Sequence, residues 1–156
     1  MAHKLAKPPR IHWVALRETV RTAVATLVSL LLARTLKLPE YYWAPISTIV
    51  ILQSTIDPLQ GSWQRFVGTA VGAVLGGVFA TFFARTAVTY AAGIFLCGIV
   101  ALIFRVWNAY RVTAITFTIV VLISHGPVWH TAWHRFLEVS LGIVVALLAA
   151  LVPPRK

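Results

Sequence analysis

The chain contains one block of sequence twice, at a constant offset of about 70 residues. The clearest matches are four residues in each copy, namely Trp63, Arg65, Phe66 and Gly72, then Trp133, Arg135, Phe136 and Gly142. The offset continues upstream, where the run 44–54 resembles the run 114–124. Repetition at a fixed period constrains the fold before any single element is considered, so we interpret the chain as two related halves.

Each half contains three long apolar runs. We predict membrane spans at 20–36, 43–56, 66–83, 87–104, 112–124 and 135–152. Three crossings per half turn the second half upside down relative to the first, as in the inverted-topology repeats of many secondary transporters. The predicted fold class is an all-α membrane protein with six transmembrane helices in two inverted three-helix repeats, 20–86 and 87–152. We assign 1–19 to a basic cytoplasmic N-terminal segment and 153–156 to a short cytoplasmic tail.

The composition identifies the chain as a membrane protein. Hydrophobic residues make up 59% of the 156 residues, charged residues make up 12%, and the mean hydropathy is +0.82. These values lie far from those of a soluble domain. Outside the predicted spans the longest segment, 1–19, has 19 residues, whereas an independent domain needs roughly 50. We therefore expect no soluble catalytic or nucleotide-binding domain, and energy from ATP would have to come from another chain.

Catalytic motifs are missing from the sequence. It contains no Ser-His-Asp set, no paired carboxylates and no glycine-rich phosphate loop with a lysine, so we expect neither an enzyme nor a bound cofactor. Three histidines, His125, His130 and His134, lie close together. No cysteine or aspartate accompanies them, and we expect no metal site. Cys97 lies inside the fourth span, and we interpret it as a small buried apolar residue.

The distribution of Lys and Arg predicts the orientation in the membrane. With the N-terminus inside, the cytoplasmic side carries Lys4, Lys7, Arg10, Arg17, Arg65, Arg105, Arg111, Arg155 and Lys156. The opposite side carries Arg34, Lys37, Arg85 and Arg135. The positive-inside rule then places both termini in the cytoplasm. This rule and attraction to anionic lipids explain the formal net charge of +10, so we expect the lipid bilayer as a partner and no nucleic acid.

The second and fifth spans occupy equivalent positions in the two halves, and both are unusually short. About 14 helical residues cover about 20 Å, against about 30 Å of bilayer hydrocarbon. Pro45 lies at the start of the second span, Asp57-Pro58 at its end, and Gly126-Pro127 follows the fifth. Paired short segments in two halves are the best indication in a sequence of a substrate site near the membrane midplane.

The starts of these two short helices are predicted to attract anions. A helix N-terminus has free amides and a partial positive charge, so we expect an anion between the N-termini near Pro45 and near Thr113. Trp43 flanks the first of these N-termini and Arg111 flanks the second. The aromatic residues fit two interpretations, an interfacial belt or a surface on which a substrate stacks.

Arg65 and Arg135 are predicted to lie at the starts of the third and sixth helices. A cation at a helix N-terminus opposes the macrodipole, so its repetition needs a reason. One reason is snorkelling to lipid headgroups, and the other is that each arginine lines an anion vestibule, Arg65 at the inner mouth and Arg135 at the outer. Glu138, three residues after Arg135, is its simplest ion-pair partner, and a role as proton carrier is the alternative.

Small residues recur at every fourth position in the third and sixth spans. They are Gly68, Gly72, Gly76 and Ala80, then Gly142, Ala146 and Ala150. Such faces allow two helix backbones to approach closely. We interpret them as packing surfaces, either between the two halves or between subunits.

Two segments resemble the signature of the fusaric acid resistance family, which includes aromatic acid exporters and is similar to plant aluminium-activated malate channels. They read YWAPISTIVILQ at 42–53 and WQRFVGT at 63–69, and further matches lie at 21–24, 38–39 and 135–138. The resemblance implies a bacterial inner-membrane protein that exports organic, often aromatic, carboxylates or conducts organic anions. It adds Gln53 to the candidate binding residues. Many members carry two six-helix units, so the single unit here implies a homodimer or a higher homo-oligomer.

Three functions compete on this sequence. The leading one is an exporter of organic anions driven by a proton or voltage gradient, and the others are a passive organic-anion channel and a non-transporting scaffold subunit. The candidate substrate-binding residues are Trp43, Pro45, Gln53, Arg65, Arg111, Thr113 and Arg135, and Glu138 is the candidate for coupling. A cationic-drug exporter is disfavoured because no acidic residue lies at the middle of a span.

Overall fold

The computed structural model describes residues 13–123 and 126–152, and every regular element in these ranges is helical. The helices are α1 (Trp13–Thr35), α2 (Trp43–Leu52), α3 (Pro58–Phe82), α4 (Ala87–Ile103), α5 (Tyr110–Thr118) and α6 (Val128–Ala150). The all-α prediction is therefore confirmed for the described residues. Most of the basic N-terminal segment, the pair Ser124 and His125, and the predicted tail lie outside the described ranges.

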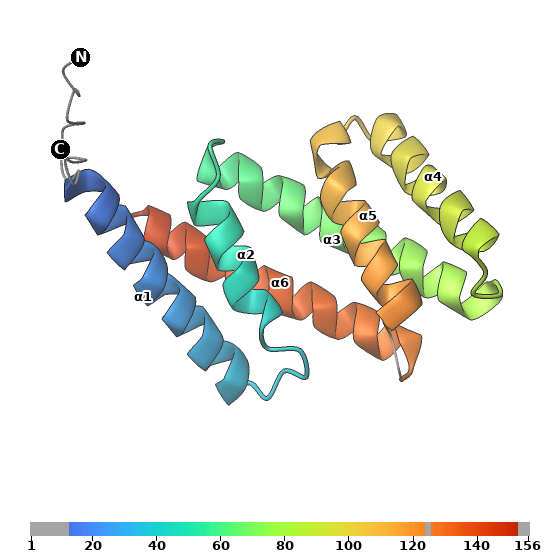
Figure 1. The fold of residues 1–156 in the computed structure, drawn as a ribbon, viewed down its shortest axis with the longest axis horizontal. Helices are drawn as coiled ribbons and strands as arrows, with labels where there is room; N and C mark the ends of the chain where they lie inside the picture. The colour runs from blue at the N-terminus through green and yellow to red at the C-terminus, as the bar shows by residue number, and fades with distance from the viewer. Residues whose placement is uncertain (1–12, 124–125, 153–156) are drawn as a thin grey trace, which may run out of the picture.

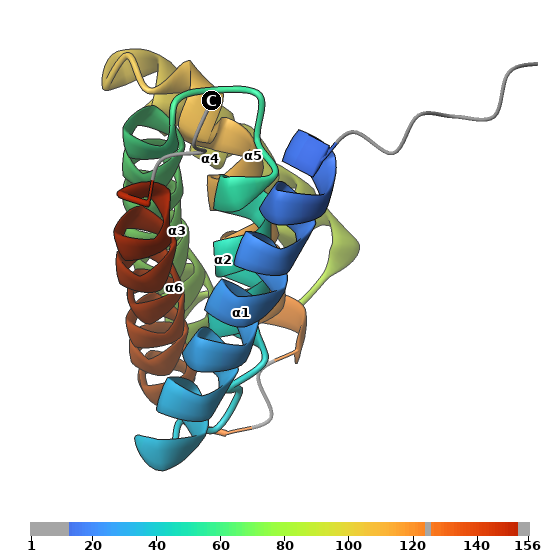
Figure 2. The same cartoon turned by 90° about the vertical axis from the view of Figure 1, so that its left-hand side faces the viewer.

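The two longest apolar helices, α3 and α6, lie side by side and run in opposite directions (Figures 1 and 2). The other helices pack on the same side of this pair. Helices α1 and α2 contact α6, whereas α4 and α5 contact α3. One packed group thus contains α1 and α2 from the first half of the sequence and α6 from the second. The other group contains α4 and α5 from the second half and α3 from the first.

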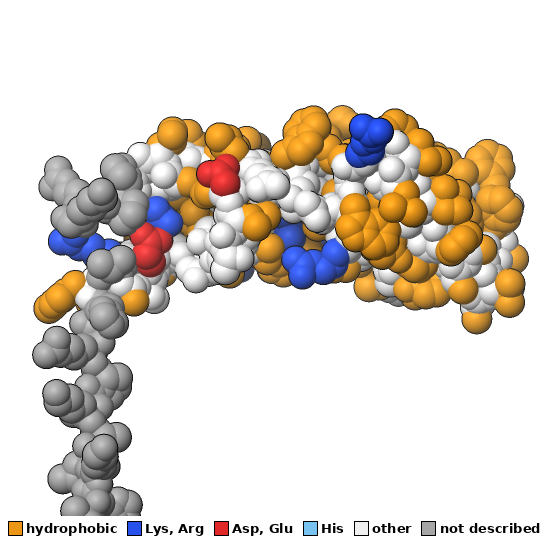
Figure 3. Space-filling model, turned by 90° about the horizontal axis from the view of Figure 1, so that it is seen from above, with side chains coloured by type: hydrophobic (Ala, Val, Ile, Leu, Met, Phe, Trp, Pro, Cys, Tyr) orange, Lys and Arg blue, Asp and Glu red, His pale blue; other side chains and the backbone are white. Residues whose placement is uncertain are grey.

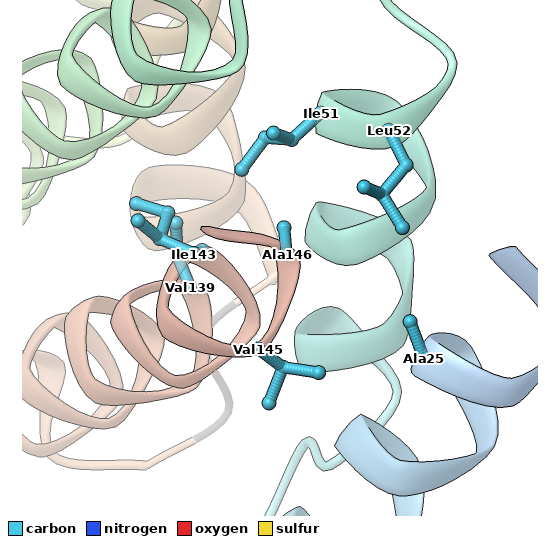
Figure 4. Close-up of a cluster of buried hydrophobic side chains, with 7 residues drawn as sticks. All are labelled: Ala25, Ile51, Leu52, Val139, Ile143, Val145 and Ala146. Atoms are coloured by element: carbon cyan, nitrogen blue, oxygen red, sulfur yellow. The ribbon is translucent and has the colours of Figure 1, made fainter. Parts of the chain in front are cut away.

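A cluster of buried apolar side chains holds the first of these groups together. It joins α1, α2 and α6 through Ala25, Ile51, Leu52, Val139, Ile143, Val145 and Ala146 (Figure 4). In the second group the corresponding cluster contains Cys97, Phe117 and Val121, with Cys97 fully buried. The interpretation of Cys97 as a buried apolar residue is confirmed.

Three predicted helix starts are wrong, because α1, α3 and α6 each begin about two turns before the predicted positions at 20, 66 and 135. The Asp57 side chain accepts hydrogen bonds from the amides of Leu59 and Gln60, and Pro58 occupies the first turn of α3. Asp at the N-cap and Pro in the first turn start a helix. The sequence prediction instead assigned Asp57-Pro58 to the end of the preceding helix. Pro127 likewise precedes the first residue of α6.

The two short helices are present where the sequence predicts them. Helix α2 begins at Trp43, as predicted, and has 10 residues. Helix α5 has 9 residues, follows a 3-10 turn at Trp107–Ala109 and continues into a π-helical segment at Ile119–Ile123. A π-helical segment inside a helix often marks a functional region.

The glycine faces are used for packing within the chain. A Cβ atom on Gly72 would meet the carbonyl oxygen of Thr113 in α5, and a Cβ on Gly142 would meet the carbonyl oxygen of Ala44 in α2. The hydroxyl of Thr48 also donates to the Gly142 carbonyl over 3.1 Å. Of the two interpretations of these faces, the structure therefore selects contact between the halves, and the glycines no longer indicate an oligomer.

The exposed surface fits a membrane environment. By length and composition, α3 and α6 can each cross a membrane, while α2, α4 and the segment Trp107–Ile123 are apolar but shorter. Large exposed hydrophobic side chains occur on every helix. On the face shown in Figure 3 they dominate the surface, and the Lys and Arg side chains are confined to a few separate patches.

Candidate functional site

A cavity of about 530 Å³ lies between α2, α3 and the start of α5. Its lining contains two arginines, Arg65 and Arg111, and three neutral polar side chains, Ser54, Gln64 and Asn108. Apolar residues make up most of the remaining wall, among them Trp43, Ile46, Val50, Ile51, Ile56, Val112 and Ile115. The volume falls in the range typical of small-molecule sites.

The two arginines of the cavity come from helices of different halves. Arg65 projects from the second turn of α3 and is partly buried, whereas Arg111 lies in the first turn of α5 and is exposed. Their charges are close enough to act on each other. No acidic side chain of the described residues lines the cavity. Two like charges in an apolar surrounding, without a carboxylate beside them, make the cavity attractive to an anion.

The macrodipole argument for Arg65 and Arg135 was wrong. Because α3 and α6 begin at Pro58 and Val128, both arginines lie about two turns inside their helices, beyond the first turn over which the dipole acts. The amides of Trp43 and Tyr110, at the starts of the short helices, donate to carbonyls in the preceding turn. These two amides are therefore not free to bind an anion, and the cavity beside them contains the positive charges of Arg65 and Arg111. An anion between the two helix N-termini stays a prediction.

Arg135 lies beside the cavity, behind Trp43. Its guanidinium carbon stands 3.5 Å from the centre of the Trp43 ring, a cation–π contact, and the residue is only 2% exposed. Trp43 also lines the cavity, and the charge of Arg65 acts on Arg135. The two arginines therefore lie near the same tryptophan, but only Arg65 lines the cavity. That they face opposite mouths stays a prediction.

Arg135 pairs with Glu40 and not with Glu138. The closest atoms of the ion pair, Arg135 Nη1 and Glu40 Oε2, are 3.5 Å apart. Glu138 is fully buried, and its Oε1 accepts a 2.8 Å hydrogen bond from the backbone amide of Glu40. The expected ion pair within α6 was wrong, because Glu138 instead anchors the loop between α1 and α2.

Besides Arg135, three further predicted binding residues lie away from the cavity wall. Gln53 donates a 2.8 Å hydrogen bond to Thr22 in a shallow groove between α1 and α2. Pro45 is buried in the first turn of α2, and Thr113 is buried against α3 with its hydroxyl bonded to the Ala109 carbonyl. These side chains shape or support the helices around the cavity, whereas Trp43, Arg65 and Arg111 contact it directly.

The structure gives no set of metal ligands within the described ranges. No group of three His, Cys, Asp or Glu side chains gathers there. His130 and His134 pack edge to face, with their Nε2 atoms 2.9 Å apart, and His125 lies outside the described residues.

Three further residues contribute to the site and were not among the predicted ones, namely Glu40, Gln64 and Asn108. Glu40 carried a signal, because the chain contains only four acidic residues among 14 basic ones and Glu40 directly precedes the aromatic segment at Trp43. Gln64 lies inside the repeated block, between Trp63 and Arg65. Asn108 had no comparable signal, since its place in the wall follows from the packing of α5 on α3.

Comparison with known proteins agrees with this membrane fold. Residues 24–149 match the family described as fusaric acid resistance protein-like. Inner membrane protein YeeA of Escherichia coli (strain K12) is 28% identical over 144 residues, which cover 87% of this chain and 40% of YeeA. The chain thus spans less than half the length of this curated relative, and no solved structure matches it. The family is of a membrane transporter type, and the relative indicates a bacterial inner-membrane location. The chain belongs to the fusaric acid resistance protein-like family.

Proposed function

We propose that this protein transports organic anions such as aromatic carboxylates across the bacterial inner membrane, as an exporter driven by a proton or voltage gradient. The observation that carries the proposal is the cavity between α2, α3 and α5, which contains Arg65 and Arg111 and no described acidic side chain. The family name points the same way, because fusaric acid is itself an aromatic carboxylic acid.

The chemistry of the cavity matches both parts of such a substrate. The guanidinium groups of Arg65 and Arg111 present planar donors to a carboxylate. The wall formed by Trp43, Ile46 and Val50 offers apolar contact to an aromatic ring. A cationic substrate would meet two like charges, so anions are favoured electrostatically.

The proposal includes six membrane spans arranged as two inverted halves. Two features of the packing support it. Helices α3 and α6 run in opposite directions, and each packs against the short helix of the other half through an equivalent glycine, Gly72 in α3 and Gly142 in α6. The Lys and Arg distribution supports a multi-pass chain with both termini in the cytoplasm. We also propose a homodimer or higher homo-oligomer, which cross-linking in lipid would test.

Glu138 is the proposed coupling residue. It is a fully buried acid on α6, one helical turn from Arg135, so its protonation would change the balance of charge beside the cavity. The first alternative, a passive channel, has the same architecture and needs no such residue.

Flux measurements in liposomes test the function. Purified protein reconstituted into liposomes is expected to move radiolabelled benzoate, and Arg65→Gln is expected to reduce the initial rate about tenfold. Arg34→Gln is the matched control, because Arg34 is an exposed arginine on α1 that contacts Tyr41 and does not line the cavity. Benzoate flux equal to that of protein-free liposomes, or equal flux in the Arg65 and Arg34 variants, would contradict the proposal.

A further inference from the structure

Arg135 is a buried cation whose hydrogen-bonding capacity is unused. None of its three guanidinium nitrogens forms a hydrogen bond with a described residue. Its ion pair with Glu40 is 3.5 Å long, whereas charge-assisted hydrogen bonds between such groups measure about 2.7–2.9 Å. An arginine offers five donors in a fixed fork, and leaving them unmatched in a buried place is costly.

The surroundings of Arg135 leave the donors at the edge of its guanidinium buried and without a hydrogen-bond partner. One face of the guanidinium is covered by the Trp43 ring, so the ring takes the planar surface and leaves the donors at the edge. Glu138 accepts from the amide of Glu40 through Oε1, and its buried Oε2 has no hydrogen-bond partner among the described residues and forms no ion pair with Arg135. Glu40 is the described acid that pairs with Arg135, and it does so loosely.

The position of Glu40 allows its side chain to leave the ion pair with Arg135 and return. It lies in the loop between α1 and α2, and its side chain is 28% exposed while that of Arg135 is 2% exposed. The backbone of Glu40 is held by Glu138, so a movement of its side chain leaves the loop anchored.

From these contacts we propose that Arg135 is a second carboxylate-binding site, which Glu40 occupies as an internal competitor and which a transported carboxylate takes over by displacing Glu40. The inference rests on the proposed function, because it places this site next to the cavity of Arg65 and Arg111. Trp43, which contacts Arg135 and lines the cavity, separates the two positions.

The competition has a measurable consequence. A tethered group acts at a high effective concentration, and a ligand that binds only the open form has its affinity reduced by the fraction of molecules in that form. Removing the Glu40 carboxylate is therefore expected to tighten binding of a carboxylate at Arg135. A purely structural ion pair predicts the reverse, since its loss leaves Arg135 buried without a partner.

The test is benzoate binding, measured by titration calorimetry on the protein in lipid nanodiscs. Glu40→Gln keeps the backbone amide that Glu138 holds, and it is expected to bind benzoate at least about threefold more tightly than the parent. Glu40→Asp, with a shorter reach, is expected to shift in the same direction. Glu18→Gln is the control, because Glu18 also pairs with an arginine, Arg21, and its side chain is 31% exposed, but it lies far along α1.

The outcomes separate this inference from the proposed function. Unchanged or weaker binding by both Glu40 variants overturns the internal competitor, and if Arg65→Gln still lowers benzoate flux, the transport function stands. Tighter binding that persists when Arg135→Gln is combined with Glu40→Gln also overturns it, because the gain must then come from another site. Thermal unfolding of each variant in the same nanodiscs identifies a change that reflects loss of folded protein.

Discussion

The ring of Phe66 packs against the ring of Phe136, with centroids 5.1 Å apart, and the two residues hold equivalent positions in the two halves of the sequence. Each ring also stacks on the tryptophan three residues before it, with centroids 6.4 Å apart for Trp63 and 6.0 Å apart for Trp133. A residue that meets its own equivalent lies close to a rotation axis relating two copies. This contact supports the inverted arrangement that we propose.

Close packing of α6 on α2 predicts a strong effect of enlarging Gly142. Gly142→Ala is expected to lower the free energy of unfolding by about 2 kcal/mol or more, because the new Cβ would meet the backbone of α2. Gly61→Ala is the control, since its nearest neighbour would lie at an ordinary 3.5 Å and alanine favours the helix. Thermal unfolding in detergent measures both, and similar midpoints would show that the two helices are less closely packed.

The contact between Trp43 and Arg135 predicts an energetic coupling. In a double-mutant cycle with Trp43→Leu and Arg135→Gln, we expect a coupling of about 1–2 kcal/mol, as for a desolvated cation–π pair. The exposed pair of Tyr41 and Arg34, at 4.9 Å, is the comparison and should give about 0.5 kcal/mol. Chemical unfolding of the seven proteins of the two cycles, which share the parent, provides the values. Equal coupling in both pairs would argue against a buried contact at Trp43.

The different burial of Arg111 and Arg135 predicts different responses to salt. Arg111→Gln should slow benzoate flux strongly at about 20 mM salt and weakly at about 500 mM, because Arg111 is exposed and its attraction is screened. The effect of Arg135→Gln should persist, because Arg135 is 2% exposed. For both, Lys should be milder than Gln, since it keeps the charge and loses the planar fork. Flux that responds identically to salt in both Gln variants would place the two arginines in similar environments.

Neutralising Glu138 distinguishes a coupled transporter from a channel. In Glu138→Gln the side-chain carbonyl can still accept the hydrogen bond from the Glu40 amide, so the loop should remain anchored. A coupled transporter should lose the stimulation of benzoate flux by a pH gradient, whereas Glu18→Gln should keep it. If stimulation survives in Glu138→Gln, another group carries the proton; if the parent shows none, the passive channel is favoured.

The proposed orientation predicts which loops react with an external reagent. In a Cys97→Ala background, Thr55→Cys lies in the loop before α3 and should be protected from a membrane-impermeant maleimide in intact cells. Ala84→Cys, in the loop after α3, should be labelled. Both positions are exposed in the structure, so accessibility is decided by the membrane. Labelling of both from the same side would rule out α3 as a span.

Several properties of this protein follow from its sequence because they depend on local order. The duplicated block, the apolar runs and the two short helices could each be recognised from neighbouring residues, and α2 begins at the predicted Trp43. Arg65, Arg111 and Trp43 could also be selected as candidates, since their residue types suit an anion. The predicted starts of α1, α3 and α6 are wrong, and at α3 and α6 the residues Asp57-Pro58 and Pro127 start the next helix.

Only the tertiary structure decided which side chains meet. Helices α3 and α6 each pack with two helices of the opposite half, and this arrangement places Gly142 against α2 and brings Arg65 and Arg111 to one cavity. It also brings Arg135 to Glu40, so that Arg135 pairs with Glu40 and not with Glu138. Such pairings join residues far apart in the chain, and their energies depend on how whole helices pack. A sequence pattern with a period of a few residues identifies the apolar face of a helix. Which other helix packs on that face is decided by the packing of all six helices together.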